Sequence, residues 1–329
     1  MLATTPRRLP GTLARGLIRG NCDHQRDVLC AAIDIGSNTT RVLVAEPQDG
    51  QLRKVMEQRA YTRIGKHANK NGKITGDKIT EVAEVVTTQV RLAQEIGAEV
   101  TKVVATAAIR EAKNREKVTK AIEKMAGLPV EVLSEEEEGR FAFIGATKSL
   151  GHPVQGTVAV VDVGGGSSEV IFGTLSKGVN QVRSWKIGSG SLAEEHLKSD
   201  PPSAAEIRSL RDAIGDLFDD VELKHPDQAV AVGGSATSLR TLVGAVLEYE
   251  TLERAVRVLS SAPIAEVSKR FELDPRRVEL LPAGVLLLEK FSDLLGQPLQ
   301  IGKGGLREGI ILDLLNGSAD GSSSKALAA

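Results

Sequence analysis

Two short segments combine an aspartate at the end of an apolar run with glycines and small polar side chains. Their candidate site residues are Asp34, Gly36, Ser37 and Asn38 in the first segment and Asp162, Gly164, Gly165, Gly166, Ser167 and Ser168 in the second. Such turns let backbone amides and short side chains approach a phosphate closely, because no bulky group intervenes. One turn alone is more typical of a plain hairpin. Two turns in equivalent places predict a site that binds a phosphate chain from both sides.

The two aspartates are candidates for metal binding. A carboxylate at the end of an apolar strand is unfavourable to bury unless it binds a metal, activates water or accepts hydrogen bonds from turn amides. Hydrogen bonding to the turn stays open as the alternative for both Asp34 and Asp162. Glu169 lies at the far side of the second turn and could share an ion with Asp162. We therefore expect Mg²⁺ or Mn²⁺ at Asp162 and Glu169, and phosphate binding at Asp34.

A run of four glutamates, residues 135–138, follows Ser134 at a predicted helix start. The run complements the positive end of a helix dipole, and this plain interpretation suits three of the four. Glu138 differs because it shares a helical face with Phe141, Ala142 and Gly145, and it therefore points inward. A carboxylate in that position can act as a general base on water. We predict that Glu138 is the catalytic base.

Arg110 and a third glycine-rich segment complete the candidate site. Arg110 follows an apolar run and is predicted to project from a strand end. An ion pair with Glu111 or Glu138 and a role as a phosphate clamp are equally compatible with the sequence. Gly233, Gly234 and Ser235 form a turn before a helix predicted over 238–247, and we expect them to bind phosphate.

Residues 53–73 form a strongly basic segment. It contains seven Lys and Arg residues against Glu57 alone. A solvated loop is one interpretation, and a surface that attracts an extended polyanion is the other.

The elements that must position these residues alternate between strands and helices. Residues 158–172 overlay residues 30–44 at one fixed offset, which predicts two related domains that each open with a β-hairpin. Helices are predicted from residue 79 to a cap at Gly97, over 115–125 and over 134–150. The remaining predicted elements are strands at 102–105, 129–133 and 229–232 and helices at 204–218 and 305–315. This order predicts an α/β fold. The predicted division is a disordered extension 1–28, domains 29–152 and 153–316, and a disordered tail 317–329.

The composition of the chain limits which classes of partner are expected. The chain has 329 residues, more than the roughly 100 to 200 that one hydrophobic core usually holds, so two domains are expected. With 42 basic and 43 acidic residues, no overall field attracts nucleic acid or a membrane, and neither is expected as a partner. Cys22 and Cys30 support neither a zinc site nor a disulfide framework, which fits a reducing cytoplasm. A homodimer is compatible with the sequence, which does not decide the oligomeric state.

Taken together, these motifs resemble the exopolyphosphatase and guanosine pentaphosphate phosphatase family, within the superfamily of actin, Hsp70 and the sugar kinases. The likeness runs from Ala31 to about Leu315 and includes the two turns, residues 105–110, 134–140, 233–237 and 305–309. It implies two actin-like, ribonuclease H-like domains with a cleft between them. It also implies that Glu138 activates water, that Arg110 binds phosphate, and that Asp162 and Glu169 support a magnesium-bound phosphate.

The expected activity is hydrolysis of the terminal phosphoanhydride of inorganic polyphosphate, of the 5'-gamma phosphate of guanosine pentaphosphate, or of both. The sequence does not rank the two substrates. Two departures from the family pattern are Glu135, where many members have Gly, and the basic stretch 65–68. A nucleotide-dependent kinase or ATPase of the same superfamily and a non-catalytic sensor of guanosine penta- or tetraphosphate are the alternatives.

Overall fold

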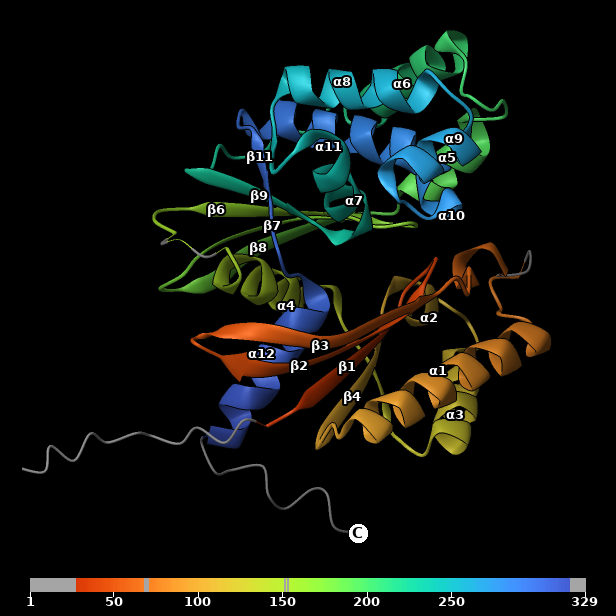
Figure 1. Ribbon diagram of the computed structural model, residues 1–329, viewed down its shortest axis with the longest axis vertical. Helices are drawn as coiled ribbons and strands as arrows, with labels where there is room; N and C mark the ends of the chain where they lie inside the picture. Colours follow the sequence, from red (N-terminus) through yellow and green to blue (C-terminus); the bar gives the residue numbers. More distant parts are fainter. Residues whose placement is uncertain (1–27, 68–70, 151, 153, 320–329) are drawn as a thin grey trace, which may run out of the picture.

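The chain forms two α/β halves, each built on a sheet that carries one of the predicted turns (Figure 1). The structure is a computed structural model that describes residues 28–67, 71–150, 152 and 154–319. Most of the predicted extension and tail, residues 1–27 and 320–329, lies outside the described residues.

The first sheet has five strands in the order β3-β2-β1-β4-β5. Their bounds are β1 Cys30–Ile35, β2 Thr40–Gln48, β3 Gln51–Ala60, β4 Val100–Ala105 and β5 Val130–Val132. β1 and β2 form the predicted hairpin, and β1 pairs in parallel with β4. The elements that follow β3 are η1 Ile64–His67, α1 Gly76–Ile96, α2 Ala107–Arg110 and α3 Arg115–Ala126.

The second sheet repeats this plan with six strands in the order β10-β11-β9-β6-β7-β8. Their bounds are β6 Val158–Val163, β7 Ser168–Thr174, β8 Gly178–Trp185, β9 Gln228–Val232, β10 Val246–Leu247 and β11 Leu299–Ile301. The helices of this half are α5 Ser189–His196, α6 Ala204–Leu217, α7 Gly233–Val243, α8 Tyr249–Ser260, α9 Ile264–Phe271, α10 Pro275–Val278 and α11 Leu281–Leu295. β6 and β7 form the second predicted hairpin, and β6 pairs in parallel with β9.

Two further helices, α4 Glu135–Lys148 and α12 Leu306–Ala319, pack against each other and against the sheets (Figure 1). Phe141 of α4 packs with residues of β1 and β2, whereas Ala142, Phe143 and Ala146 pack with residues of β6, β7 and β9. α4 therefore has the first sheet on one side and the second on the other. Period-two alternation then turns Asp34 and Asp162 toward this layer, because each lies on the strand face opposite the residues that pack on the outer helices.

The packing differs from the predicted division in two places. α4 contacts the second sheet although it precedes residue 152, and α12 contacts β1 and β2 although it was expected in the second domain. The close approach of α4 and α12 explains the difference. A Cβ added at Gly145 would lie 1.9 Å from the Gly305 carbonyl oxygen, so the two backbones touch and the helices pack as one unit. α12 also continues to Ala319, beyond the predicted end at residue 315.

Local signals place most other elements where they were expected. Gly97 and Gly127 end α1 and α3 in the left-handed conformation, which suits glycine. Ser134 and Glu137 form the predicted capping box at the start of α4. One element differs: α7 starts at Gly233, so the predicted glycine-rich turn is the first turn of a helix that ends at Val243. Among the described helices, none is both long and apolar enough to cross a membrane.

Candidate active site

The two predicted turns have the same geometry and meet at their tips. The Gly36 amide donates to the Thr39 carbonyl at 3.0 Å, and the Gly164 amide donates to the Ser167 carbonyl at 2.9 Å. A Cβ added at Gly165 would lie 2.7 Å from the Cβ of Asn38 across the gap between the halves. Glycine is therefore required for this approach, and the halves are closed on each other at the turns.

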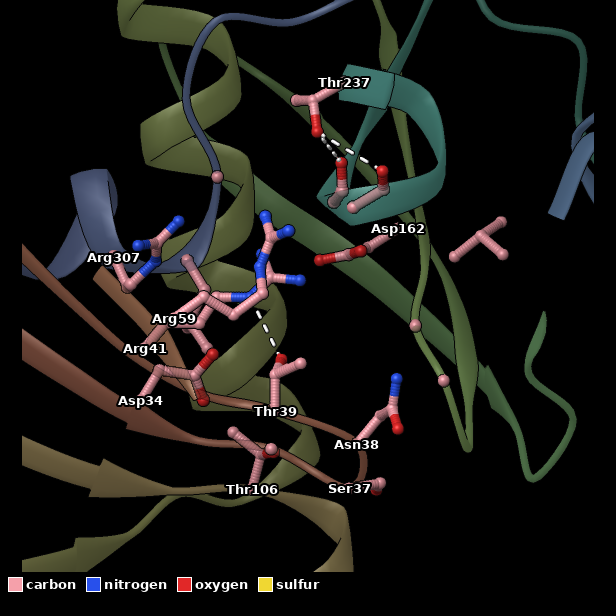
Figure 2. Close-up of a pocket in the computed structure, with 18 of the residues that line it drawn as sticks. Asp34, Ser37, Asn38, Thr39, Arg41, Arg59, Thr106, Asp162, Thr237 and Arg307 are labelled. Carbon is pink, nitrogen blue, oxygen red and sulfur yellow. Dashed lines mark hydrogen bonds between the residues drawn. The ribbon is translucent and has the colours of Figure 1, made fainter. Parts of the chain in front are cut away.

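A pocket of about 270 Å³ opens between the two halves (Figure 2). Thirteen of the predicted site residues line it: Asp34, Gly36, Ser37, Asn38, Glu138, Asp162, Gly164, Gly165, Gly166, Ser167, Glu169, Gly233 and Gly234. Residues far apart in the sequence thus form one pocket. Its lining also includes Thr237, which lies one turn into α7.

Two predicted phosphate ligands face away from this pocket. Ser168 is fully buried at the start of β7, where its hydroxyl donates to the Ile187 carbonyl at 2.7 Å. Ser235 is buried in the first turn of α7 and packs against Gly284 of α11. The physical reason is the periodicity of side-chain direction. Ser168 follows the turn as the first residue of β7, and Ser235 is the third residue of α7, where it lies on a different helix face from Gly233 and Gly234. Neither serine lines the pocket, and the structure corrects both predictions.

Glu138 lies where the predicted inward face of α4 places it. Its Oε2 atom accepts a hydrogen bond from Arg110 Nη1 at 2.8 Å, and its side chain is 18% exposed. Burial raises the pKa of Glu138 to about 7, while the hydrogen bond and charge of Arg110 act in the opposite direction. Glu136 is exposed. Glu138 thus combines access to the pocket with a pKa close to that of an effective general base at neutral pH.

Arg110 does not line the pocket. It belongs to α2, a short helix that follows β4, and it donates to the Leu133 carbonyl at 3.0 Å as well as to Glu138. Of the two interpretations that the sequence left open, the geometry shows the ion pair with Glu138. Arg110 holds the Glu138 carboxylate in place without itself lining the pocket.

Five further carboxylates line the pocket together with Glu138; Glu57 and Glu308 are paired with basic residues, and the other three are those of Asp34, Asp162 and Glu169. Burial raises the pKa of Asp162 to about 6 and also raises the pKa of Asp34 and of Glu169. Asp162 and Glu169 pair across the hairpin, so their side chains project from the same face of the sheet. Asp34 Oδ1 is buried with no hydrogen-bond partner in the described part of the chain. Buried carboxylate oxygens of this kind suit a hard divalent cation.

The described residues include no group of three or more metal-ligating side chains that could hold an ion alone. Mg²⁺ usually binds through one or two carboxylates, with substrate phosphates and water completing its shell. Asp162 and Glu169 fit that pattern. A phosphate-bound ion suits this pocket better than a protein cage does.

Six basic side chains line the same pocket: Arg41, Lys54, Arg59, Arg277, Lys303 and Arg307. The sequence pointed to Lys54 and Arg59 only as members of the basic segment 53–73, and it did not point to the other four. In Figure 2 the side chains of Arg41, Arg59 and Arg307 extend into the pocket near Asp34. Lys54 pairs with Glu308 at 3.0 Å, and Arg307 pairs with Glu57 at 2.7 Å. Within the described chain, no ion pair joins the other four to a carboxylate.

Arg41 and Arg277 are the two of these cations whose pKa is lowered by burial. Burial, together with the charges of Arg307, Arg277 and Arg59, lowers the pKa of Arg41 to about 9. Arg277 has two guanidinium nitrogens, Nε and Nη2, without partners among the described residues, and it packs on Gly234. A signal for Arg41 existed in the sequence, because a charged residue in an otherwise apolar strand needs a partner. No comparable signal marked Arg277.

The basic segment 53–73 contributes unevenly. Lys54 and Arg59 reach the pocket, whereas Arg53 pairs with Glu46 and Arg63 lies 3.9 Å from Glu279. Lys70 lies outside the described residues. The polyanion surface that the sequence suggested is therefore supported at the strand end of the segment.

Comparison with known proteins gives consistent matches. Residues 43–317 match the Ppx/GppA phosphatase family. The chain is 28% identical to exopolyphosphatase 1 of Mycobacterium leprae over 88% of this chain and 90% of that protein. It is 26% identical to a guanosine-5'-triphosphate,3'-diphosphate pyrophosphatase of Vibrio cholerae, over 87% of this chain and 59% of that protein. The crystal structure of the Aquifex aeolicus family member aligns with a TM-score of 0.74 at 32% identity, covering 90% of this chain and 99% of that one.

Proposed function

The chain belongs to the Ppx/GppA phosphatase family, and we propose that it removes the terminal phosphate from inorganic polyphosphate, with guanosine pentaphosphate as a second substrate. The family match confirms both the resemblance and the two-domain actin-like fold expected from the sequence. The chain is a phosphoanhydride hydrolase. One observation supports the substrate class above all others: Glu138 shares a pocket with six basic side chains.

In the proposed reaction, the terminal phosphate lies between the two turns. Glu138 accepts a proton from water, and the water oxygen bonds to the terminal phosphorus as the bridging P–O bond breaks. The products are inorganic phosphate and a chain that is one phosphate shorter. Arg110 orients Glu138, and the backbone amides of the turns with Arg41 and Arg277 stabilise the negative charge that moves to the phosphate oxygens.

Asp162 and Glu169 would hold Mg²⁺ or Mn²⁺ together with the substrate. The ion, when bound, neutralises charge on the phosphoanhydride oxygens. Ionised carboxylates alone would repel a polyanion. The raised pKa values of these acids, and a bound cation, both reduce that repulsion.

We expect polyphosphate to be the preferred substrate because charged side chains line the pocket but its described lining presents no surface on which a nucleobase could stack. No aromatic side chain is among the described residues that line it, whereas nucleobases commonly stack on aromatic rings. The relatives named exopolyphosphatase 1 and 2 are also matched over 90% and 96% of their length. A cytoplasmic location, a homodimer, and the absence of nucleic-acid and membrane partners remain predictions from the sequence.

The test is phosphate release from polyphosphate of defined length, guanosine pentaphosphate and ATP, measured side by side with Mg²⁺. We expect the highest kcat/KM with polyphosphate and lower values with guanosine pentaphosphate. Transfer of phosphate from ATP to an acceptor would support a kinase instead. Binding of guanosine pentaphosphate without any phosphate release would support a sensor.

A further inference from the structure

A second cavity, of about 410 Å³, adjoins the active-site pocket at the two turns. Five residues line both spaces: Ser37, Asn38, Gly165, Gly166 and Ser167. Away from the turns, the second cavity is lined by η1, α2 and α5, including Gly65, Ala107, Ala108, Ala112, Gly190 and Ser191. Mostly small side chains leave this space open. A cavity needs roughly 15 Å³ to admit a water molecule, so this one is large enough for water and for a small ion.

The charges of the two spaces differ. The active-site pocket is lined by six basic and six acidic side chains, and four of the basic ones have no carboxylate ion-pair partner in the described chain, namely Arg41, Arg59, Arg277 and Lys303. The second cavity has one basic residue, Lys186, and two acids, Glu111 and Glu194. Lys186 is already paired with Glu111 at 3.0 Å. Cations that are free to bind the phosphates of a polyanion therefore line the first space, and the described lining of the second space offers none.

This difference orients the substrate. The bulk of a polyphosphate chain lies among the basic residues of the active-site pocket, and its terminal phosphate lies at the turns. After cleavage, the shortened chain blocks the way back through that pocket. The free phosphate then has the second cavity on its other side.

We propose that the second cavity is the exit path for the inorganic phosphate product. This inference rests on the proposed function. The path allows phosphate to leave while the shortened chain stays bound, so the next terminal phosphate can advance to the turns. The one basic side chain in the described lining is already paired, so the lining does not hold the departing anion as a binding site would.

Two contacts between the halves close the path. The first is the meeting of the turn tips, where Gly165 approaches Asn38 and Gly166 approaches Ser37. The second is the ion pair between Glu111, at the end of α2, and Lys186, which follows β8. The Lys186 and Glu111 side chains are 76% and 41% exposed, and exposed pairs contribute at most about 1 kcal/mol. The ion pair therefore opens readily, and small movements of the halves control release.

Filling the cavity tests the proposal. Ala108 lines the second cavity but not the active-site pocket. It packs, partly buried, against the hydrophobic core between the first sheet and helices α1 and α3. Ala121 of α3 packs on the same core and lines neither space, so Ala121→Phe is a matched control. In a rapid-mixing experiment with polyphosphate, acid quenching measures bond cleavage and a fluorescent phosphate reporter measures release. We expect Ala108→Phe to leave the first cleavage unchanged and to slow release roughly tenfold or more, which separates the two time courses.

Ala121→Phe should leave cleavage and release as in the wild type. Ser191→Phe, from the opposite wall and on an exposed position, repeats the test if Ala108→Phe unfolds. Coincident cleavage and release in both cavity variants would overturn the exit path. So would a raised KM for polyphosphate with normal release, because the cavity would then hold the chain. Absence of cleavage in the wild-type acid quench would instead overturn the proposed function.

Discussion

At the scale of single residues, the central feature is a buried carboxylate held by one arginine. Glu138 accepts a hydrogen bond from Arg110, which does not line the pocket. Glu138 also shares the pocket with acidic and basic side chains. Desolvation sets its pKa, and the arginine limits that rise. Three predictions follow from this balance and from the neighbouring acids.

Glu138→Gln should abolish turnover while substrate binding persists. Removing a general base typically lowers the rate by about 100-fold to 10,000-fold, whereas losing one helix-dipole charge costs only about 0.3–1 kcal/mol. Glu136→Gln is the matched control, because Glu136 lies in the same helical turn and is exposed. Phosphate release and polyphosphate binding would be measured for both. A severalfold loss in Glu138→Gln, or equal losses in the two variants, would show that the run only stabilises the helix start.

The pH profile should report Glu138. The base must be ionised to accept a proton, and burial raises its pKa to about 7, so kcat/KM should fall as the pH drops below about 7. Arg110 lowers this pKa, so Arg110→Ala should move the acidic limb to higher pH, and Arg110→Lys should restore part of the shift. A uniform loss at every pH, with the limb unmoved, would contradict the role of Arg110 as a positioning residue.

Metal binding should depend on Asp162. Asp162→Asn removes an anionic oxygen from the expected Mg²⁺ site, and the Mg²⁺ concentration for half-maximal activity should rise roughly tenfold or more. A thermal-shift titration with Mg²⁺ and a polyphosphate provides a readout independent of turnover. Asp219→Asn, on an exposed position of the same half, is the control. Full wild-type activity in excess chelator would exclude the metal role.

At the scale of elements, the inner layer of α4 and α12 determines where the site lies. Asp34 and Asp162 face this layer from opposite sheets, and Glu138 lies in the first turn of α4. The layer depends on backbone contact between the two helices, which only glycine permits at Gly145 and Gly309.

Gly145→Ala should therefore lower the free energy of unfolding. The new Cβ would lie 1.9 Å from the Gly305 carbonyl oxygen, and inserting a methyl group into a packed contact typically costs about 1–3 kcal/mol. Gly215→Ala is the control, because no atom lies within 4 Å of its added Cβ, and alanine in a helix gains roughly 0.5–1 kcal/mol over glycine. Denaturant unfolding of both variants measures the difference. Equal stability of the two variants would show that the helices can separate without cost.

At the scale of the whole molecule, the internal repeat places two similar turns on two halves that close on each other. The repeat is not symmetric in charge, since Arg41 lies opposite Asp34 in the strand register of the first hairpin, where Glu169 lies opposite Asp162 in the second. In the proposed reaction, one half supplies a cation for the phosphate and the other an acid for a metal ion. The proposed reaction uses both, so we expect closure of the halves to assemble the site.

Gly165→Ala should impair closure. Gly165 does not have a positive φ, so alanine fits the backbone, but its Cβ would lie 2.7 Å from Asn38 Cβ in the other half. Misplacing a reacting group by about 1 Å can cost 100-fold in rate, and we expect a loss of roughly this size in kcat/KM with normal thermal stability. Adding Asn38→Gly, which removes the opposing Cβ, should restore part of the activity. Wild-type kinetics in the single variant would show that the turns need not meet.

The sequence by itself determined the features that depend on local spacing. The repeat and the small residues of the turns predicted two hairpins, which the structure confirms. Helical periodicity placed Glu138 on an inward face, and the Ser134 capping box located the start of α4. These signals survive folding because backbone hydrogen bonding and the period of each element are decided within a few residues.

Only the tertiary structure decided which residues from distant parts of the sequence come together in the pocket. Arg59, Arg277 and Arg307 come from β3, α10 and α12, and no spacing in the sequence relates them. Arg110 could have faced a phosphate or Glu138, and Ser168 and Ser235 resembled ligands until the faces of β7 and α7 were known. The physical reason is that packing between elements distant in sequence selects which faces converge. The charge of the pocket, and its boundary with the second cavity, arise only when the two halves close.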